Sequence, residues 1–348
     1  MIYPPRKSLT MSAFRSYYYT VAIASLIALT GCSGSTTTNS TQTPAATSPV
    51  ASNTQTATHN HGGGKKININ SAILSELDKL EAKLGIPALS NQIQASRPYA
   101  STEELVTKKV ITQAQFDQIK DMVTIEDVVL TGEAKDVDYM TKLGLMKGHL
   151  LVAKELLDLQ QPKQAEPHIG HPVEEIYTDV EEQLNERKVK EFKTTLISLQ
   201  DLVKSQPKDA KVATEFGTSM QAVDAAIQGI PEAQRQSPKF VLQVINGLLD
   251  AANAEYGAAI ADNKISALIE YQDSRGFVIY ANTLYQTIAA QMAKEQPEAH
   301  KAITTSMAEL AKNWPSVTAP AAPVKTPDQV TQLIKTIEQN SQKVISNS

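Results

Sequence analysis

Histidine and carboxylate side chains that could bind a metal ion gather in two stretches of this 348-residue chain. His171 and Glu175 are four residues apart, and Glu270 and Asp273 are three apart, so each pair could share one face of a helix. Imidazole and carboxylate groups brought together suit a transition metal such as zinc, copper or iron. Six residues form the candidate ligand set: His149, His168, His171, Glu175, Glu270 and Asp273.

The same residues also have a structural interpretation without a metal. His168 and His171 could satisfy a buried turn through hydrogen bonds, and His149 could be a packed core residue. Carboxylates three residues apart, such as Glu270 and Asp273, commonly lie on a solvated helix face. The sequence leaves both interpretations open, because only the distances between these side chains decide between them.

No motif in the sequence indicates an enzyme. The chain lacks a Gly-x-Ser-x-Gly motif, a phosphate-binding glycine loop, a His-Glu-x-x-His motif and any cysteine other than Cys32. Residues 168–171 have the letters of the class I aminoacyl-tRNA synthetase signature, but no lysine-rich partner motif or strand-rich nucleotide fold accompanies them. We therefore expect a non-catalytic protein, with a transition-metal ion as its only candidate cofactor.

The elements that must position these side chains are helices. The chain is rich in Ala, Leu, Gln, Lys and Glu, has 5% aromatic residues, and at 41% hydrophobic residues can form a core. From Asp136 onward the apolar spacing predicts one continuous helical region, with Gly144 and Gly148 as kinks or points of close packing. We expect its first helix to end at Gln161-Pro162 and the next to have Pro172 near its first position. Further helices are expected over 190–205, 210–227, 238–260, 265–292 and 297–313, with a last amphipathic helix starting at Thr326.

A shorter helical unit precedes this region. Leu74, Leu77 and Leu80 mark its first helix, a second follows Pro87, a third is expected to begin with a capping box from Ser101 to Glu104, and a fourth spans 116–123. Ile67-Asn68-Ile69-Asn70, Pro98-Tyr99-Ala100-Ser101 and Phe116-x-x-Ile119-Lys120 resemble the helix-hairpin-helix module of ComEA-type DNA receptors and of photosystem II extrinsic protein U. The resemblance covers Lys66 to about Ile125.

The resemblance implies that backbone amides of the two hairpin turns could hold a DNA phosphate. The candidate residues are Gly85, Ile86, Lys108 and Lys109. Pro87 replaces the second glycine of the first turn, and the second turn has no glycine. Residues 65–123 contain eight basic and seven acidic residues, too small an excess for nonspecific DNA affinity. DNA is therefore a disfavoured partner, and an unidentified protein partner is favoured.

A second resemblance lies towards the C-terminus. Glu255-Tyr256, the turn at Asn263-Lys264 and Glu270-Tyr271 with Asp273 are similar to the extracytoplasmic helical domain of bacterial high-affinity iron permeases, over roughly 248–281. The resemblance implies a soluble, metal-handling relative of that domain. The membrane-embedded motifs of the permeases are absent from the sequence, so we do not expect a transporter.

We expect the first 31 residues to form an export signal. Basic residues precede an apolar run over 20–29, and Leu29-Thr30-Gly31-Cys32 follows. This order resembles the signal of bacterial lipoproteins and implies lipid on Cys32 and attachment to a bacterial membrane, at its periplasmic side or at the cell surface. Residues 33–58 carry no charge and predict a flexible tether. The chain after the signal has 30 Lys and Arg against 37 Asp and Glu, so it has no overall attraction to nucleic acid.

The predicted fold is all-α: a small helix-hairpin-helix domain followed by a larger helical bundle, after a disordered signal and tether. The predicted boundaries are 1–31 for the signal, 32–64 for the lipidated Cys32 and tether, 65–128 for the helix-hairpin-helix domain, 136–314 for the bundle, 315–326 for a Pro/Ala linker and 327–348 for the C-terminal helix. The first functional hypothesis is a lipid-anchored, non-catalytic binding or scaffold protein. The alternatives are extracytoplasmic binding of an iron-like metal ion and ComEA-like surface binding of DNA.

Overall fold

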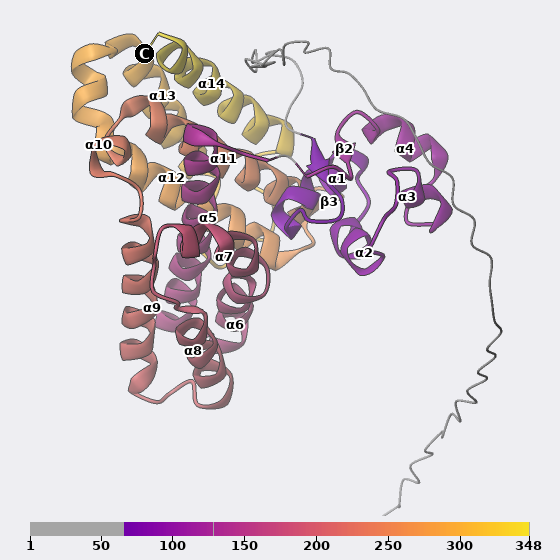
Figure 1. Ribbon diagram of the computed structural model, residues 1–348, viewed down its shortest axis with the longest axis horizontal. Coiled ribbons are helices and arrows are strands. Elements are labelled where there is room, and N and C mark those ends of the chain that lie inside the picture. Colours follow the sequence, from indigo (N-terminus) through magenta and orange to yellow (C-terminus); the bar gives the residue numbers. More distant parts are fainter. Residues whose placement is uncertain (1–65, 128, 348) are drawn as a thin grey trace, which may run out of the picture. The chain divides into compact units, whose positions relative to one another are not determined.

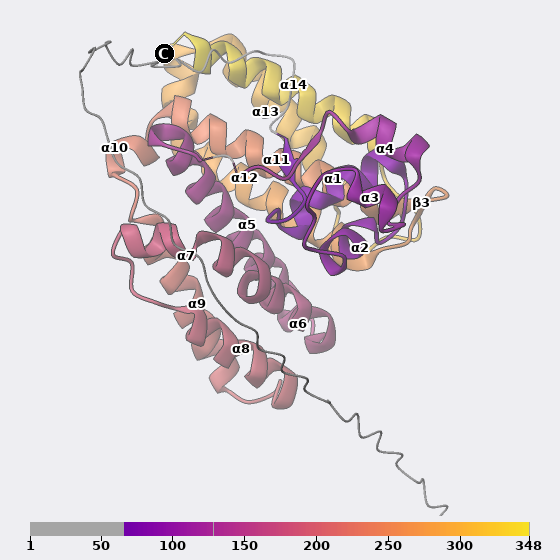
Figure 2. The ribbon, with the colours of Figure 1, turned by 45° about the vertical axis from the view of Figure 1, so that its right-hand side comes forward.

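A computed structural model describes residues 66–127 and 129–347 of the chain. The fold is all-α, as predicted, and Figures 1 and 2 show its helices from two directions. The helices are α1 (Leu74–Leu84), α2 (Leu89–Ala95), α3 (Glu104–Thr107), α4 (Gln113–Ile119), α5 (Gly132–Asp158), α6 (Pro162–His171), the π-helical segment η1 (Pro172–Ile176), α7 (Tyr177–Glu186), α8 (Lys193–Ser205), α9 (Lys211–Ile227), α10 (Glu232–Arg235), α11 (Pro238–Ala259), α12 (Leu268–Glu295), α13 (Pro297–Ala311) and α14 (Pro327–Ser346). The strands are β1 (Ile67–Asn68), β2 (Val123–Thr124), β3 (Ile260–Ala261) and β4 (Lys264–Ile265). The predicted signal, lipidated Cys32 and tether lie outside the described residues.

The four short helices α1 to α4 surround a small apolar core of their own. Leu77, Leu80 and Leu105 are fully buried there, each removing an amount of apolar surface worth about 1.5–3 kcal/mol. The ends of this unit are joined by β1 and β2, which pair in parallel with Ile67 opposite Val123. Two predictions about this unit are wrong. The fourth helix ends at Ile119 rather than at residue 123, because the chain turns there into β2.

The predicted capping box at Ser101 is also wrong. Helix α3 begins only at Glu104, and its N-cap, Glu103, makes no side-chain capping bond. A capping box instead begins α4, where Thr112 and Gln115 bond each other's backbone amides. The same arrangement of Thr326 and Gln329 begins α14, at the position predicted. These two pairs satisfy amides that have no partner inside their helices.

The larger core forms around α5, α11 and α12, which contact one another along their lengths. Tyr256, Tyr271 and Phe277 are fully buried there, and the tyrosine hydroxyls reach acceptors in the segment that follows α13. Helices α13 and α14 pack beside α11 and α12, as Figures 1 and 2 both show. These contacts fix α11 and α12 against α5, so any side chains that face inward from these three helices are held in register.

Helices α6, η1 and α7 follow one another without a break, which differs from the prediction. The chain leaves α5 at Asp158 and turns through Gln160 in the left-handed region, and α6 begins at Pro162. The preceding helix was predicted to end at Gln161-Pro162, but Pro162 is instead the first residue of the next helix, α6. Pro172 lies inside the run, at the start of η1, where the wider π-helical turn accommodates a residue without an N–H. Short π-helical segments in helices are common at functional sites.

Helices α11 and α12 are joined by a tight hairpin. Strands β3 and β4 pair antiparallel, and Asp262 and Asn263 between them both have positive φ, as a two-residue type I′ turn requires. The segment 315–326, predicted as a linker, is not helical, but Val317 in it is buried against α12. In the part of the chain that the structure describes, no helix is long and apolar enough to span a membrane.

Candidate metal centre

The site lies at the crossing of α5 and α12, where glycines let the two backbones contact each other directly. A Cβ atom added to Gly276 would lie 2.3 Å from the carbonyl oxygen of Gly148, and one added to Gly148 would lie 3.0 Å from the Gly276 carbonyl carbon. Only glycine fits at both positions. His149 follows Gly148 in α5, and Asp273 lies one helical turn before Gly276 in α12, so the crossing places these two side chains together.

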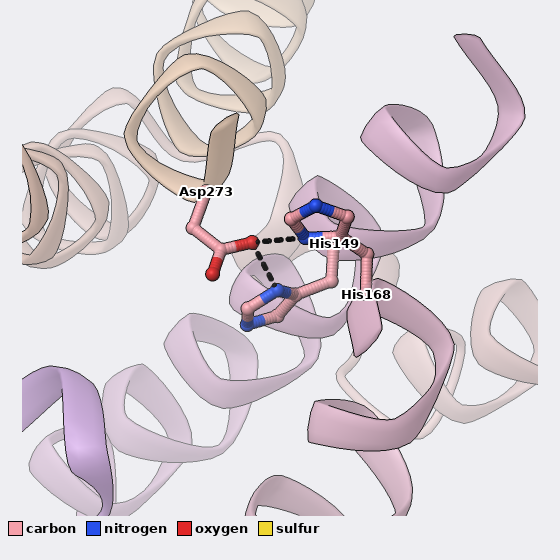
Figure 3. A group of neighbouring side chains, drawn as sticks. All are labelled: His149, His168 and Asp273. Atoms are coloured by element: carbon pink, nitrogen blue, oxygen red, sulfur yellow. Dashed lines mark hydrogen bonds and ion pairs between the residues drawn. The ribbon is translucent and has the colours of Figure 1, made fainter. Parts of the chain in front are cut away.

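His149, His168 and Asp273 meet in the buried interior at this crossing (Figure 3). Asp273 Oδ1 lies 2.7 Å from Nδ1 of His149 and 2.7 Å from Nδ1 of His168. His168 comes from α6, so three separate helices each supply one group. One ligand atom from each residue lies within 4.8 Å of the others, a spacing that one metal ion can bridge.

Gln272 determines which ring nitrogen of His168 carries a proton. The Gln272 amide nitrogen donates to the backbone carbonyl of Val317 at 3.2 Å and to Gln164 Oε1 at 3.1 Å. Its oxygen must therefore be the atom that lies 2.9 Å from Nε2 of His168, and this nitrogen is a donor. His168 consequently turns its other nitrogen, Nδ1, towards the carboxylate of Asp273.

A positive centre must lie between His168 and Asp273. A neutral His168 that donates from Nε2 has a lone pair on Nδ1, and this lone pair would face a carboxylate oxygen at 2.7 Å. A proton on Nδ1, or a metal ion bound to both atoms, turns that repulsion into attraction. A metal-binding histidine usually donates its second N–H to a carbonyl or carboxylate oxygen, as His168 does to Gln272.

His171 adds a third imidazole at the edge of the cluster. Its Nδ1 lies 3.6 Å from Asp273 Oδ2, and its ring is edge-on to that of His149 with 5.4 Å between centroids. The His171 side chain is 26% exposed, whereas those of His149 and His168 are at most 5% exposed. His171 therefore connects the buried cluster with its surroundings.

A cavity of about 40 Å³ adjoins the cluster, a volume that suits a water molecule or an ion. Its lining includes His149, His171 and Asp273 on one side and Glu175 and Glu270 on another. The remaining lining side chains come partly from α1, α2 and α11: Leu74, Asp78, Ser90, Asn91 and Glu255. The cavity thus lies where the N-terminal helices meet the larger core.

The charges of the cluster follow from burial and pairing. Burial alone would raise the pKa of Asp273, but the adjacent His149 and His168 outweigh it and hold that pKa well below its usual range. Burial lowers the pKa of His149 despite the carboxylate beside it. Burial also opposes a charge on His171, but Asp273, Glu175 and Glu270 outweigh this and raise its pKa to about 9. The centre therefore holds an ionised carboxylate that favours positive charge nearby.

All six candidate metal ligands lie in or beside this one site. Glu175 and Glu270 line the cavity rather than the cluster, and burial raises the pKa of both. The Glu175 carboxylate also accepts a hydrogen bond from the backbone of Leu74, at the start of α1. Sequence reasoning missed Gln272, Asp78 and Glu255 as parts of the site. The adjacency of Gln272 to Asp273 and the place of Glu255 in the iron-permease resemblance were the available signals, and nothing in the sequence relates Asp78 to Glu255.

The four DNA-phosphate candidates stay separate from this site. Gly85 ends α1 with φ of 63°. The backbone amides that follow this turn already have a partner. The Glu81 carboxylate accepts hydrogen bonds from the N–H groups of Ala88 and Ser90 at 2.9 and 3.2 Å. A carboxylate from inside the module thus fills the place that an external phosphate would need.

The second turn is likewise committed to internal contacts. The Lys108 ammonium donates to the backbone carbonyls of Ser96 and Pro98 and lies over the ring of Tyr99. Lys109 has φ of 61°, in the left-handed region. The resemblance of this unit to ComEA-type modules stays a prediction, and the predicted lipidation site, Cys32, lies outside the described residues.

Comparison with known protein families gives one match. Residues 231–348 match a family described as "Iron permease-associated 4-helix bundle domain". The matched segment contains α11 to α14 and so includes Glu255, Glu270 and Asp273, whereas His149, His168 and His171 precede it. No curated protein and no solved structure matches the chain. The match confirms the predicted C-terminal resemblance to an iron permease-associated helical domain and extends it from roughly 248–281 to 231–348.

Proposed function

We propose that this chain is a non-catalytic, extracytoplasmic protein that binds an iron-class divalent metal ion. The donor set is His149, His168 and Asp273, with His171 at its edge. Two histidines and one carboxylate are a combination typical of non-haem iron(II) sites. The matched iron permease-associated domain supports the choice of iron, since it supplies Asp273 of this donor set.

One observation carries the proposal. His168 Nδ1 faces Asp273 Oδ1 at 2.7 Å while its Nε2 already donates to Gln272, so this pair needs a proton on Nδ1 or a metal ion bound to both atoms. The same oxygen faces His149 Nδ1 at the same distance. A metal ion that replaces protons there must release them, so we expect metal affinity to rise with pH.

The test is metal loading of the full-length protein in detergent micelles. Anaerobic titration with Fe²⁺, followed by desalting and elemental analysis, is expected to leave one tightly held ion per chain. Asp273→Asn and His149→Gln should each lower the affinity at least about 100-fold, since each removes a direct ligand.

The matched control is His300→Gln. His300 pairs with Tyr285 outside the cluster, so its loss should leave iron binding unchanged. If the wild-type chain retains no iron, or if His300→Gln weakens binding as much as Asp273→Asn does, the proposal is wrong.

The predicted signal and Cys32 support an extracytoplasmic position for this function, with the folded part held to a membrane by lipid. A metal-binding chain of this kind needs neither ATP nor thiols. The scaffold hypothesis is compatible with it, because a tethered metal binder can also contact a protein partner. The internal occupation of both hairpin turns gives DNA binding no support.

A further inference from the structure

A larger cavity, separate from the candidate metal centre, lies where the N-terminal unit meets α5 and α7. Its volume is about 420 Å³, which is enough for a small organic molecule. Part of its lining comes from β1 and α1, through residues such as Ile67 and Glu76, and another part from α5 and α7, through Asp138, Lys142 and Gln183. None of the six candidate metal ligands lines this cavity.

Gln183 of α7 brings a buried acceptor without a donor to this cavity. The residue is 8% exposed and belongs to the lining. Its amide nitrogen donates to Asp138 Oδ2 at 3.0 Å, and this bond identifies the other amide atom as the oxygen. Among the described residues, no donor bonds this oxygen, Gln183 Oε1. A buried amide oxygen without a hydrogen bond is unfavourable, so a bound group with an N–H or O–H donor would stabilise it.

The charges beside Gln183 favour a donor that is also a cation. Lys142 Nζ bonds the carboxylate of Asp138, at 2.8 Å, and also that of Asp179. Burial would lower the pKa of Lys142, but these two carboxylates outweigh it and raise that pKa. One ammonium group is thus shared by two carboxylates, so this part of the cavity has an excess of negative charge.

The lysines elsewhere in the lining do not reverse this excess. Lys79 and Lys135 bond Asp250 and Glu186, and these two carboxylates are not part of the lining. The described lining has four lysines against five acidic residues: Glu76, Asp127, Asp138, Asp179 and Glu182. The cavity therefore attracts a positively charged ligand more than an anion.

An apolar cavity of about 300 Å³ adjoins this one, since the two share Leu130 and Asp138 in their linings. Ile73, Val137 and Leu145 line the second cavity. A ligand with its cationic group beside Gln183 has room there for an aliphatic chain, whose burial would add to the affinity.

We infer that the two cavities together bind a small organic ammonium compound with an aliphatic chain. The ammonium group donates to Gln183 Oε1 and is attracted by the carboxylates of Asp138 and Asp179. The chain packs against Val137 and Leu145. This site goes beyond the proposed function and does not depend on it, because it shares no residue with the candidate metal centre.

The probe is n-butylammonium, titrated calorimetrically into the full-length protein in detergent micelles, with a titration of micelles alone as the blank. We expect one molecule to bind per chain. The uncharged n-butanol should bind at least about tenfold more weakly, because it lacks the charge that strengthens the hydrogen bond to Gln183. Methylammonium should also bind more weakly, since each buried methylene contributes about fourfold in affinity.

Gln183→Leu removes the acceptor at similar side-chain volume and should weaken n-butylammonium binding at least about tenfold. Asp179→Asn is a second variant on a partly exposed side chain and should weaken it at least about threefold. The matched control is Gln234→Leu. Gln234 donates to Asp136 at 3.1 Å much as Gln183 donates to Asp138, but it does not line either cavity, so the affinity should be unchanged.

Three results would each overturn the inference: no heat beyond the micelle blank, equal affinities for n-butylammonium and n-butanol, or wild-type affinity in Gln183→Leu. Water alone would then satisfy Gln183. Asp273→Asn, which removes a ligand of the candidate metal centre, should leave n-butylammonium binding unchanged. A chain that retains no iron but binds n-butylammonium through Gln183 would refute the proposed function and support this second site.

Discussion

At the scale of single residues, charge burial is the main feature of this protein. Asp273 is ionised inside the core because His149 and His168 lie beside it, whereas the charged groups that act most strongly on Asp78 and Glu255 are other carboxylates. The pKa of one aspartate, Asp273, is thus lowered and that of another, Asp78, is raised, although both line the same cavity. The neighbours, and not the depth of burial, decide which carboxylate keeps its charge.

Asp78 gives a prediction for the dependence of stability on pH. Its pKa is raised from 3.8 to about 8 in the folded state, so the folded chain binds this proton more tightly than the unfolded chain does. Its contribution to stability is therefore complete below about pH 4 and is lost as the pH rises towards 8. In the presence of a chelator, Asp78→Asn should remove this decline and be more stable than the wild type at pH 9 by about 1–4 kcal/mol.

Urea unfolding at pH 5, 7 and 9 measures the effect. Asp117→Asn, on the surface of α4, serves as the control because its side chain is 55% exposed. A wild type and an Asp78→Asn variant with parallel pH profiles would contradict the assigned burial of this charge.

At the scale of elements, helix crossings determine which side chains meet. The contact of Gly148 with Gly276 joins α5 to α12, and the contact of Gly257 with Ala82 joins α11 to α1. The first crossing forms the His/Asp cluster, and the second brings Asp78 to Glu255. Small residues at the two crossings therefore let the helices approach closely enough for these charged side chains to meet.

The crossing of α5 and α12 is tested by Gly276→Ala. The added methyl group would lie 2.3 Å from the Gly148 carbonyl oxygen, so the helices must separate. We expect a loss of about 2–4 kcal/mol in stability, typical of strongly overpacked sites, together with a loss of iron binding. Denaturant unfolding and Fe²⁺ titration of the same preparation measure the two effects.

Gly217→Ala is the matched control for this substitution. Gly217 lies in the interior of α9, and a Cβ added there meets nothing within 4 Å. Alanine should stabilise this helix by about 0.5–1 kcal/mol, because glycine loses more backbone freedom on folding. Equal stability of the Gly276→Ala and Gly217→Ala variants would show that the crossing is not tight.

At the scale of the whole molecule, the N-terminal helices complete the cavity rather than forming a separate body. Leu74, Asp78, Ser90 and Asn91 line it together with residues of the larger core, and Glu175 accepts a hydrogen bond from the start of α1. This unit therefore contributes part of the wall of the cavity beside the candidate metal centre. In the first hairpin turn the Glu81 carboxylate accepts from the amides of Ala88 and Ser90, and in the second the amides of Lys109, Val110 and Ile111 donate to carbonyls of α3.

The predicted attachment of the chain to a membrane is tested by Cys32→Ser. The thioether-linked lipid needs the cysteine sulfur, and each buried methylene contributes about 0.8 kcal/mol to membrane binding. The variant should lose all incorporation of labelled palmitate, whereas Ser33→Ala should retain it. Labelling of Cys32→Ser at the wild-type level would rule out lipid attachment at this residue.

The sequence by itself determined the helical class, most helix positions and the identity of the six candidate ligands. Helical periodicity and capping residues are local signals, so Thr326 could be recognised as the start of α14. Histidine and carboxylate types on neighbouring turns could likewise be read directly. The helix starts at Glu104 and Pro162 could not be read in this way, because tertiary contacts override local preference there.

Only the tertiary structure decided which of these side chains meet. His149, His168 and Asp273 come from three helices, and their contact depends on the crossing of Gly148 with Gly276. The sequence predicted close packing at Gly148 but not its partner. Asp78 and Glu255 are related only by the packing of α1 on α11. Distances between helices are set by the summed packing of many apolar residues, so a local pattern can name the ligands but cannot assemble the site.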